Sequence, residues 1–353
     1  MTTPERIQAL GNFGYDAQEA RFLVIAALHS GYFLRRQFLS FIGGTKGWKD
    51  MLLLNKLKAN RHCRVTLYRH DRMVFHLCAK PLYEALGEKD NRNRREHQPS
   101  TIKNKIMTLD FVLEHPGYRY LATESEKLDY FRKLNIASED LPVRWYESPR
   151  GREACAKHFA DKYPIFIAGD PKETTPLVHF CYVDEGLQTT GRFETYLNQY
   201  SRLLAALPDF RVIYIAQHDR LFAKAREVFE GLIGALRPAG APLDSQARQL
   251  LDYFEMRREY EAKDFVRFNT ARLIQYREAR KRFAAQEYED LFARWQTAGN
   301  AVVLAVHDPD RDSEDCPVDR FSTCVLEHDY DLFGTLTTGS DKQTEAADAQ
   351  TQR

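Results

Sequence analysis

The sequence lacks the short motifs that mark the commonest enzyme and metal-binding families. It has no glycine-rich phosphate loop, no Gly-x-Ser-x-Gly elbow and no Cys/His cluster with the spacing of a zinc site. Its six cysteines form no Cys-x-x-Cys pair, and most lie in apolar or β-like runs, which favours reduced, buried thiols. We therefore expect no cofactor, no resident metal ion and no disulfide framework.

Long apolar runs are absent as well. No stretch reaches the roughly 18 apolar residues that a membrane helix needs, and residues 1–6 lack the basic and apolar parts of a secretory signal. Of the 353 residues, 43% are hydrophobic and 29% are charged, which is ordinary for a soluble protein of two or three domains. We expect a cytoplasmic protein that does not associate with a membrane.

The segment 17–87 has the pattern of a winged helix-turn-helix, a small DNA-binding unit. Apolar residues at helical spacing predict three helices, and two β-rich runs around a polar tip predict a hairpin, the wing. A short closing helix is expected after the wing. The predicted helices cover 17–30, 34–41, 48–59 and 80–86, and the predicted strands cover 63–68 and 73–78.

Two details of this segment support the prediction. Gly43 and Gly44 allow a sharp turn before the third helix, because glycine adopts positive φ without steric cost. In that third helix we expect Met51, Leu54 and Leu57 to form the buried face, which leaves the lysines free to point elsewhere.

Charge separates this segment from the rest of the chain. Residues 46–106 contain 15 Lys and Arg against 6 Asp and Glu, an excess of 15 − 6 = +9, whereas the whole chain carries only +1. Everything outside the window therefore sums to 1 − 9 = −8. Such asymmetry is expected of a module that contacts nucleic-acid phosphates.

We predict that the third helix enters the major groove of double-stranded DNA and that the wing tip contacts phosphate. The candidate DNA-binding residues lie before and on the third helix, on the hairpin, and in the connector after it: Lys46, Trp48, Lys49, Lys56, Lys58, Arg61, Arg64, Arg69, His70, Arg72, Arg92, Arg94 and Arg95. The alternative is a packing unit or a protein-binding surface, since winged helices serve both purposes.

A charged connector and two helices follow the wing. The connector, residues 88–99, is either a solvated surface or a segment that follows a DNA backbone, and both interpretations stay open. A helix is predicted over 100–115, and Thr123 with Glu126 forms a capping box that opens the next. These two helices are expected to complete the first domain or to link it to the second.

The remainder of the chain alternates between strands and helices, which predicts a mixed α/β core whose central strands are covered on both faces. Strands are predicted over 163–169, 177–183, 210–216, 301–307 and 321–326, helices over 193–207 and 219–236, and two or three more helices within 242–298. The fold class is therefore mixed α+β, and residues 337–353 are expected to be disordered.

Acidic residues follow two of these strands. Asp170 ends one strand and Asp184 with Glu185 ends the next, as in PD-(D/E)xK nucleases, which hold a divalent ion with carboxylates and activate water. The acid-x-Lys spacing of that motif is absent here, because Gly186 and Leu187 follow Glu185. Carboxylates at strand ends also occur simply as turn residues, so we expect no catalysis and keep a metal-dependent nuclease as an alternative.

The order of these parts resembles the replication-relaxation family of plasmids and integrative elements. The resemblance covers about residues 17–236 and is carried by the domain order and by the strand end Val183-Asp184-Glu185-Gly186, followed by a tyrosine-containing helix and a strand. The family strand usually carries Glu-x-Asp, and here Tyr182 takes the glutamate position. The resemblance implies DNA binding in control of replication, transfer or transcription of a mobile element, and a degenerate nuclease-like second domain.

We predict a winged helix-turn-helix domain over 1–120, a linking helix over 121–140, a nuclease-like α/β domain over 141–335 with a helical insertion at 242–298, and a tail over 336–353. The second domain is expected to form a homodimer, bind a protein partner or extend the DNA contact. A protein-interaction adaptor that never meets DNA is the remaining alternative.

Overall fold

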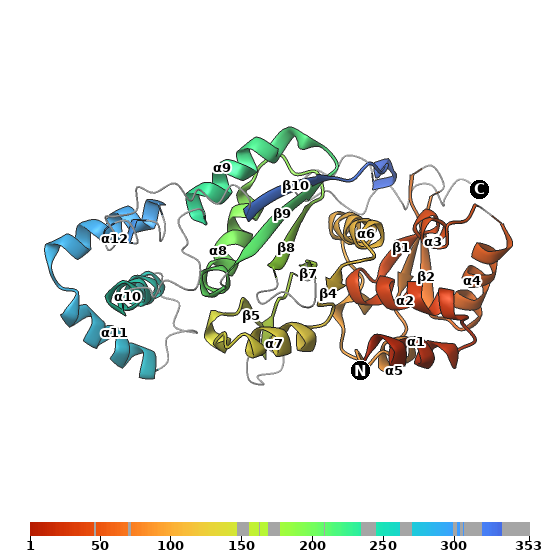
Figure 1. Ribbon diagram of the computed structural model, residues 1–353, viewed down its shortest axis with the longest axis horizontal. Coiled ribbons are helices and arrows are strands. Elements are labelled where there is room, and N and C mark those ends of the chain that lie inside the picture. Colours follow the sequence, from red (N-terminus) through yellow and green to blue (C-terminus); the bar gives the residue numbers. More distant parts are fainter. Residues whose placement is uncertain are drawn as a thin grey trace, which may run out of the picture. The chain divides into compact units, whose positions relative to one another are not determined.

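The protein forms two compact units in the computed structural model (Figure 1). One unit contains residues 1–114 together with 327–333, and the other contains residues 115–326. The structure describes residues 1–45, 47–69, 72–146, 155–161, 163–168, 177–207, 209–233, 245–261, 270–298, 302–303, 306 and 320–333. The predicted linking helix thus belongs with the second unit, and residues 327–333, which the sequence assigned to the second domain, belong with the first.

The chain is a mixed α+β protein, as predicted, with helices and strands in both units. Among the described residues, no helix has both the length and the apolar composition that crossing a membrane requires. The expected disordered tail lies outside the described residues.

The first unit follows the predicted order of helices and strands and adds four short elements. Its elements are α1 (Thr3–Gly11), α2 (Ala17–His29), β1 (Tyr32–Leu34), α3 (Arg35–Phe41), α4 (Trp48–Ala59), β2 (Cys63–Leu67), β3 (Met73–Leu77), α5 (Lys80–Ala85), the 3₁₀ turn η2 (Arg92–Arg94), α6 (Pro99–Glu114) and the 3₁₀ turn η6 (Asp331–Phe333). The additions are the helix α1, the short strand β1 and the two 3₁₀ turns.

A three-stranded antiparallel sheet in the order β1-β3-β2 closes this unit. The central strand β3 pairs with β1 through Phe33 and Phe75, whose rings stack with centroids 5.0 Å apart. Phe22 of α2 packs against Phe33 at 5.2 Å. The helices therefore cover one face of the sheet, and β2 forms its outer edge.

Local signals explain where α2 begins and ends. The Asp16 side chain accepts hydrogen bonds from the amides of Gln18 and Glu19, and the Glu19 carboxylate accepts from the Asp16 amide, which completes a capping box. Gly31, at φ +81°, follows the helix, and a Cβ there would lie 2.5 Å from the backbone oxygen of Asn93. Glycine is required at that position by both backbone conformation and space.

The second unit is built on a five-stranded mixed sheet in the order β10-β9-β8-β7-β4. The strands β8, β9 and β10 run parallel, whereas β7 is antiparallel to both β8 and β4. The sheet consists of β4 (Arg119–Tyr120), β7 (Ile165–Ala168), β8 (Leu177–Asp184), β9 (Phe210–Ala216) and β10 (Phe321–Val325), and a separate two-stranded ribbon consists of β5 (Val143–Tyr146) and β6 (Cys155–His158). Strand β8 is buried along almost its whole length, which confirms the predicted coverage of both faces.

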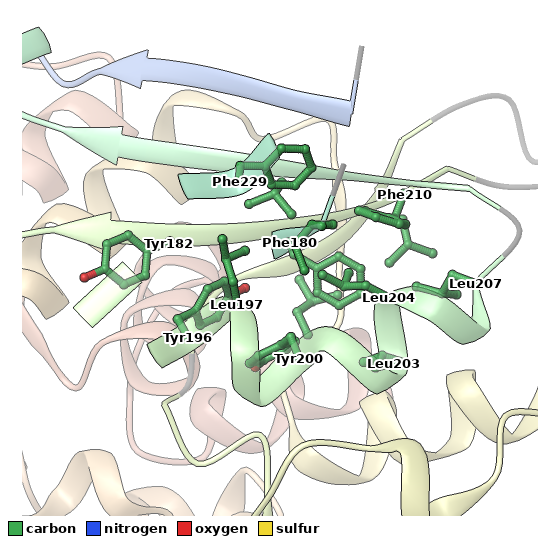
Figure 2. Packing of buried hydrophobic residues seen from close by; sticks show 14 of the residues in the cluster. Phe180, Tyr182, Tyr196, Leu197, Tyr200, Leu203, Leu204, Leu207, Phe210 and Phe229 are labelled. Carbon is green, nitrogen blue, oxygen red and sulfur yellow. The ribbon is translucent and has the colours of Figure 1, made fainter. Parts of the chain in front are cut away.

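The helices of this unit are α7 (Glu124–Lys133), α8 (Gly191–Ala206), α9 (Phe222–Leu232), α10 (Ser245–Glu261), α11 (Thr270–Arg282) and α12 (Gln286–Ala298), with 3₁₀ turns η3 (Ser138–Asp140) and η4 (Asp219–Leu221). Figure 2 shows α8 directing Leu197, Tyr200 and Leu204 toward the strands that carry Phe180 and Phe210. Residues three or four apart share a helix face, so this spacing turns one apolar side of α8 onto the sheet.

The helices α10, α11 and α12 share a second core. Tyr253, Phe254, Phe283 and Trp295 are buried in it. The strand predicted over residues 301–307 is wrong where the structure describes it, because residues 302, 303 and 306 are helical. Val303 is fully buried in this helical core.

Candidate nucleic-acid interface

Helix α4 has a buried and an exposed face. Leu53 and Leu57 are fully buried, and Asp50 on the same side is hydrogen-bonded to Arg35 and to the amide of Gly47. Burial disfavours the charged carboxylate, but these hydrogen bonds outweigh it and hold the pKa of Asp50 below its ordinary value. The helix is therefore fixed by one face.

The rest of the surface of α4, which we call its outward face, is exposed, and Lys49 and Lys58 lie on different sides of it because they are nine positions apart. Trp48, Lys49 and Lys58 are exposed, and the Trp48 side chain is 77% accessible at the first position of the helix. The prediction that Met51 is buried is wrong, because it is 45% exposed and Leu53 occupies the core in its place. The outward face thus combines cations with large apolar side chains.

The β2–β3 hairpin provides a second exposed surface next to α4, which contacts β2. Val65, Leu67 and Met73 share one face of the hairpin, since Leu67 pairs with Met73 and side chains alternate along a strand. All three are exposed, and Leu67 is 66% accessible. On the hairpin, Arg64 and Arg69 are also exposed. Exposed apolar and basic side chains therefore lie together on this element too.

The structure pairs several of the candidate cations with carboxylates. Lys56 donates to the buried carboxylate of Glu19 at 2.6 Å, and Arg72 lies 2.6 Å from Asp329. Arg64 approaches Glu96 only to 3.8 Å, with both side chains largely exposed. Pairing with Glu19 gives Lys56 a structural role, whereas Lys49, Lys58, Arg61 and Arg69 are exposed to solvent.

The connector after the wing is held inside the unit through Asn93, a role that neither open interpretation included. Asn93 is fully buried. Its side-chain amide nitrogen donates to the carbonyls of Ala27 and Leu28, and its side-chain oxygen accepts from Lys105 at 2.6 Å. Its backbone carbonyl accepts a hydrogen bond from His76 Nε2 at 3.0 Å. The connector is therefore an anchored part of the fold.

The connector arginines differ in exposure. Arg95 is exposed, whereas Arg92 and Arg94 are half-buried, and Arg94 donates to the carbonyl of Lys89 at 2.7 Å. Two other candidate residues, Lys46 and His70, lie outside the described residues. The connector therefore adds the exposed side chain of Arg95 to the exposed cations of α4 and the hairpin.

The acidic end of β8 is occupied by the chain's own donors. One oxygen of Asp184 accepts from the amides of Gly186 and Leu187 at 2.9 and 2.7 Å, and the other accepts from Tyr214 at 2.8 Å. Glu185 accepts from Arg192 at 2.8 Å. These contacts make Asp184 the cap of the turn after β8.

The remaining nuclease candidate, Asp170, lies outside the described residues. Within the described part of the chain, no group of three or more His, Cys, Asp or Glu side chains is arranged to hold a metal ion. The geometry at Asp184 is that of a structural turn.

Buried titratable side chains also occur beside the second unit's sheet. Lys127 donates to the carbonyl of Tyr163 at 3.2 Å, and burial lowers the pKa of its ammonium to about 8. Tyr200 donates to Asp161 at 3.1 Å, and burial raises the pKa of that carboxyl group. These groups lie in the interior beside α7 and α8, and the contacts that they make join those helices to residues between β6 and β7.

Sequence reasoning missed the residues that anchor this interface from elsewhere in the chain. Asp110 of α6 accepts two hydrogen bonds from Arg36, one from Gln37 and one from Tyr330. The pairs are separated by 73 to 220 positions, so no local spacing signals them.

Comparisons with known proteins yield no match, whether with family models, characterised proteins or solved structures.

Proposed function

We propose that the first unit is a winged helix-turn-helix that binds double-stranded DNA through the outward face of α4 and the β2–β3 hairpin. The observation that carries this proposal is the exposure of Lys49, Lys58 and Arg69 on α4 and on the hairpin that adjoins it. The order α2, β1, α3, α4, β2, β3 with the sheet order β1-β3-β2 supports it. Cations placed in this way release counterions when they meet phosphates.

The proposal extends to a role in replication, transfer or transcription of a mobile element, which rests on the resemblance of the sequence to replication-relaxation proteins. The second unit serves in it as a nuclease-like module without catalytic activity. Support for this part comes from Asp184, whose two oxygens are taken by Gly186, Leu187 and Tyr214.

A direct test measures binding of the full chain to a fluorescent duplex of about 20 base pairs over a range of salt concentrations. The full chain is required because Tyr330 packs into the first unit and is buried there. We expect affinity to fall steeply with salt, and Arg69→Ala to weaken binding to all sequences alike, since phosphate contacts carry no base information. Arg132→Ala in α7, an exposed arginine of the second unit, is the matched control.

A second candidate function is favoured by the exposed apolar side chains. Trp48, Leu67 and Met73 lie on the same two elements as the cations, and exposed apolar groups commonly mark protein-binding surfaces. An adaptor would bind a protein through them with little dependence on salt. Absence of DNA binding by the full chain at low salt would favour this function over DNA recognition.

A further inference from the structure

Residues 327–333, which we call the strap, follow β10 and pack against the first unit. Tyr330 is the anchor: its side chain is buried, and its hydroxyl donates to Asp110 at 2.7 Å. His328 donates to Glu114 at 2.6 Å, and Leu332 is also buried. These contacts hold the strap along α6.

The two ends of the wing turn are in contact with this strap. The ring of Phe333 packs edge-on against Tyr68, with centroids 5.1 Å apart, and Asp329 pairs with Arg72 at 2.6 Å. Tyr68 and Arg72 are themselves joined, because the amide of Tyr68 donates to the carbonyl of Arg72 at 2.9 Å. The strap thus contacts both residues that close the hairpin.

The charge of the strap opposes the charge of the wing. Glu327, Asp329 and Asp331 are acidic, and Asp329 places its carboxylate on the wing arginine. Hydrogen bonds from the Asp331 amide and from Arg72 hold the pKa of Asp329 below its ordinary value, so the carboxylate is ionised at neutral pH. A DNA phosphate would require the same guanidinium that Asp329 now occupies.

We infer that the strap is an autoinhibitory element in which Asp329 competes with DNA phosphate for Arg72. The inference rests on the proposed DNA-binding function. The competing pair is displaceable: both side chains are partly exposed, and exposed ion pairs contribute little stability. The anchor is separate from the pair, because Tyr330 is held by Asp110 inside the unit. Phosphate can therefore replace Asp329 while the strap stays docked.

Because the strap follows β10 in the sequence, the chain links the second unit to the element that pairs with Arg72. A change that strengthens or loosens the strap would alter how much of the wing's positive charge is available to DNA. The competition thus gives the first unit a graded control of affinity that needs no rearrangement of α4.

The test compares Asp329→Asn with Asp331→Asn in the full chain, by fluorescence anisotropy with the same duplex. Both variants remove one negative charge from the strap, but the side-chain pairing with Arg72 belongs to Asp329. Asparagine at 329 can still accept from the Asp331 amide, which preserves the local turn. We expect Asp329→Asn to bind several-fold more tightly with a salt slope steeper by about one phosphate contact, and Asp331→Asn to change affinity less than twofold.

A double-mutant cycle completes the experiment. With Arg72→Ala in place, Asp329→Asn should have no further effect on DNA affinity, since the arginine for which Asp329 and phosphate compete is absent. Equal tightening by the two strap variants, persistence of the effect without Arg72, or weaker binding by Asp329→Asn would each overturn the inference while leaving DNA binding intact. Failure of the wild-type chain and of all variants to bind DNA would instead overturn the proposed function itself, and the inference with it.

Discussion

Helix α4 with its hairpin and the end of β8 are both rich in charged side chains. They differ in whether those side chains are hydrogen-bonded within the protein or exposed to solvent. At β8, Asp184 is satisfied by three donors of the surrounding chain, and Glu185 accepts from Arg192. On α4 and the hairpin, Lys49 and Lys58 remain exposed. Charges that a fold engages internally stabilise it, whereas charges left at the surface are available to a partner.

The same contrast exists inside the first unit. Arg36 and Lys56 are directed to buried carboxylates, whereas Lys58, two positions after Lys56, faces solvent. Local positive charge alone therefore overstates the binding surface. The excess of +9 counted over residues 46–106 includes cations such as Lys56 and Lys105 that the fold uses itself.

The largest effect is expected from Asp110→Asn. Asp110 accepts from Arg36, Gln37 and Tyr330, and asparagine leaves the Arg36 cation without its counter-charge. Removing one member of such a pair typically costs 3–5 kcal/mol when it is fully buried, and because Arg36 is partly exposed we expect a loss of about 3 kcal/mol. Amide hydrogen exchange along α6 measures it. A loss under 1 kcal/mol would mean that the network holds the strap weakly.

A smaller effect is expected at Asp184→Ala, which tests whether the β8 end is structural. The change leaves the amides of Gly186 and Leu187 and the hydroxyl of Tyr214 without their acceptor, so stability should fall by about 2 kcal/mol. Thermal unfolding measures this loss, and magnesium or manganese should leave the wild-type midpoint unchanged.

The alternative of a metal-dependent nuclease predicts the opposite result at Asp184. A rise in the wild-type midpoint with millimolar metal that disappears in Asp184→Asn, together with nicking of supercoiled DNA, would restore the nuclease interpretation. Asp209→Asn, an exposed acidic position before β9, is the control for general charge effects.

The buried histidine of β8 gives the second unit a pH dependence. Burial, reinforced by Arg211, lowers the pKa of His179 to about 4 in the folded state, against about 6.5 when unfolded. The unfolded chain therefore takes up its proton first as pH falls, and stability present above pH 6.5 is lost toward pH 4.

Between pH 7 and pH 5.5 this linkage should cost about 1 kcal/mol, which hydrogen exchange of β8 and β9 amides can measure. His179→Phe keeps the stacking on Phe166, whose centroid lies 4.6 Å away, and should remove that pH dependence. The exposed His218→Gln is the control. An unchanged pH profile in His179→Phe would show that other groups set it.

Local patterns predicted most of the elements, and their limits are physical. Periodic apolar spacing found α2, α4 and α8, because each has a buried and an exposed side, and two β-rich runs around a polar tip found the β2–β3 hairpin. The strand β1 has three residues, too few for any periodicity. Helix α1 was missed although Thr2 and Glu5 form a capping-box signal, with the Thr2 amide donating to Glu5 at 2.7 Å.

The features that the sequence did not predict depend on tertiary packing and on contacts between distant residues. The pattern of an apolar run such as 301–307 fits either a strand or a buried helix, and its described residue Val303 is buried in the core of α10–α12. Nothing near Asn93 or Tyr330 in the sequence indicates their partners, because those partners lie 65 and 220 positions away. For the interface, the sequence could name the basic residues but could not separate those engaged by Glu19 or Asp329 from those left exposed.

The smallest effect should come from Lys58→Gln, and its comparison with Lys56→Gln isolates the argument about engaged and available charge. The two lysines share one helix and one chemistry, but Lys56 donates to buried Glu19 whereas Lys58 is exposed. Lys58→Gln should leave stability within about 0.5 kcal/mol of wild type and reduce the salt slope of DNA binding by about one. Lys56→Gln should do the reverse, lowering stability by about 1 kcal/mol with the slope unchanged, because Glu19 loses a charged hydrogen-bond donor. Thermal unfolding and anisotropy titrations on both variants measure the two quantities. If both variants changed the salt slope of DNA binding equally, Lys56 would have to leave Glu19 when DNA binds. The distinction between engaged and available cations would then not hold for this helix.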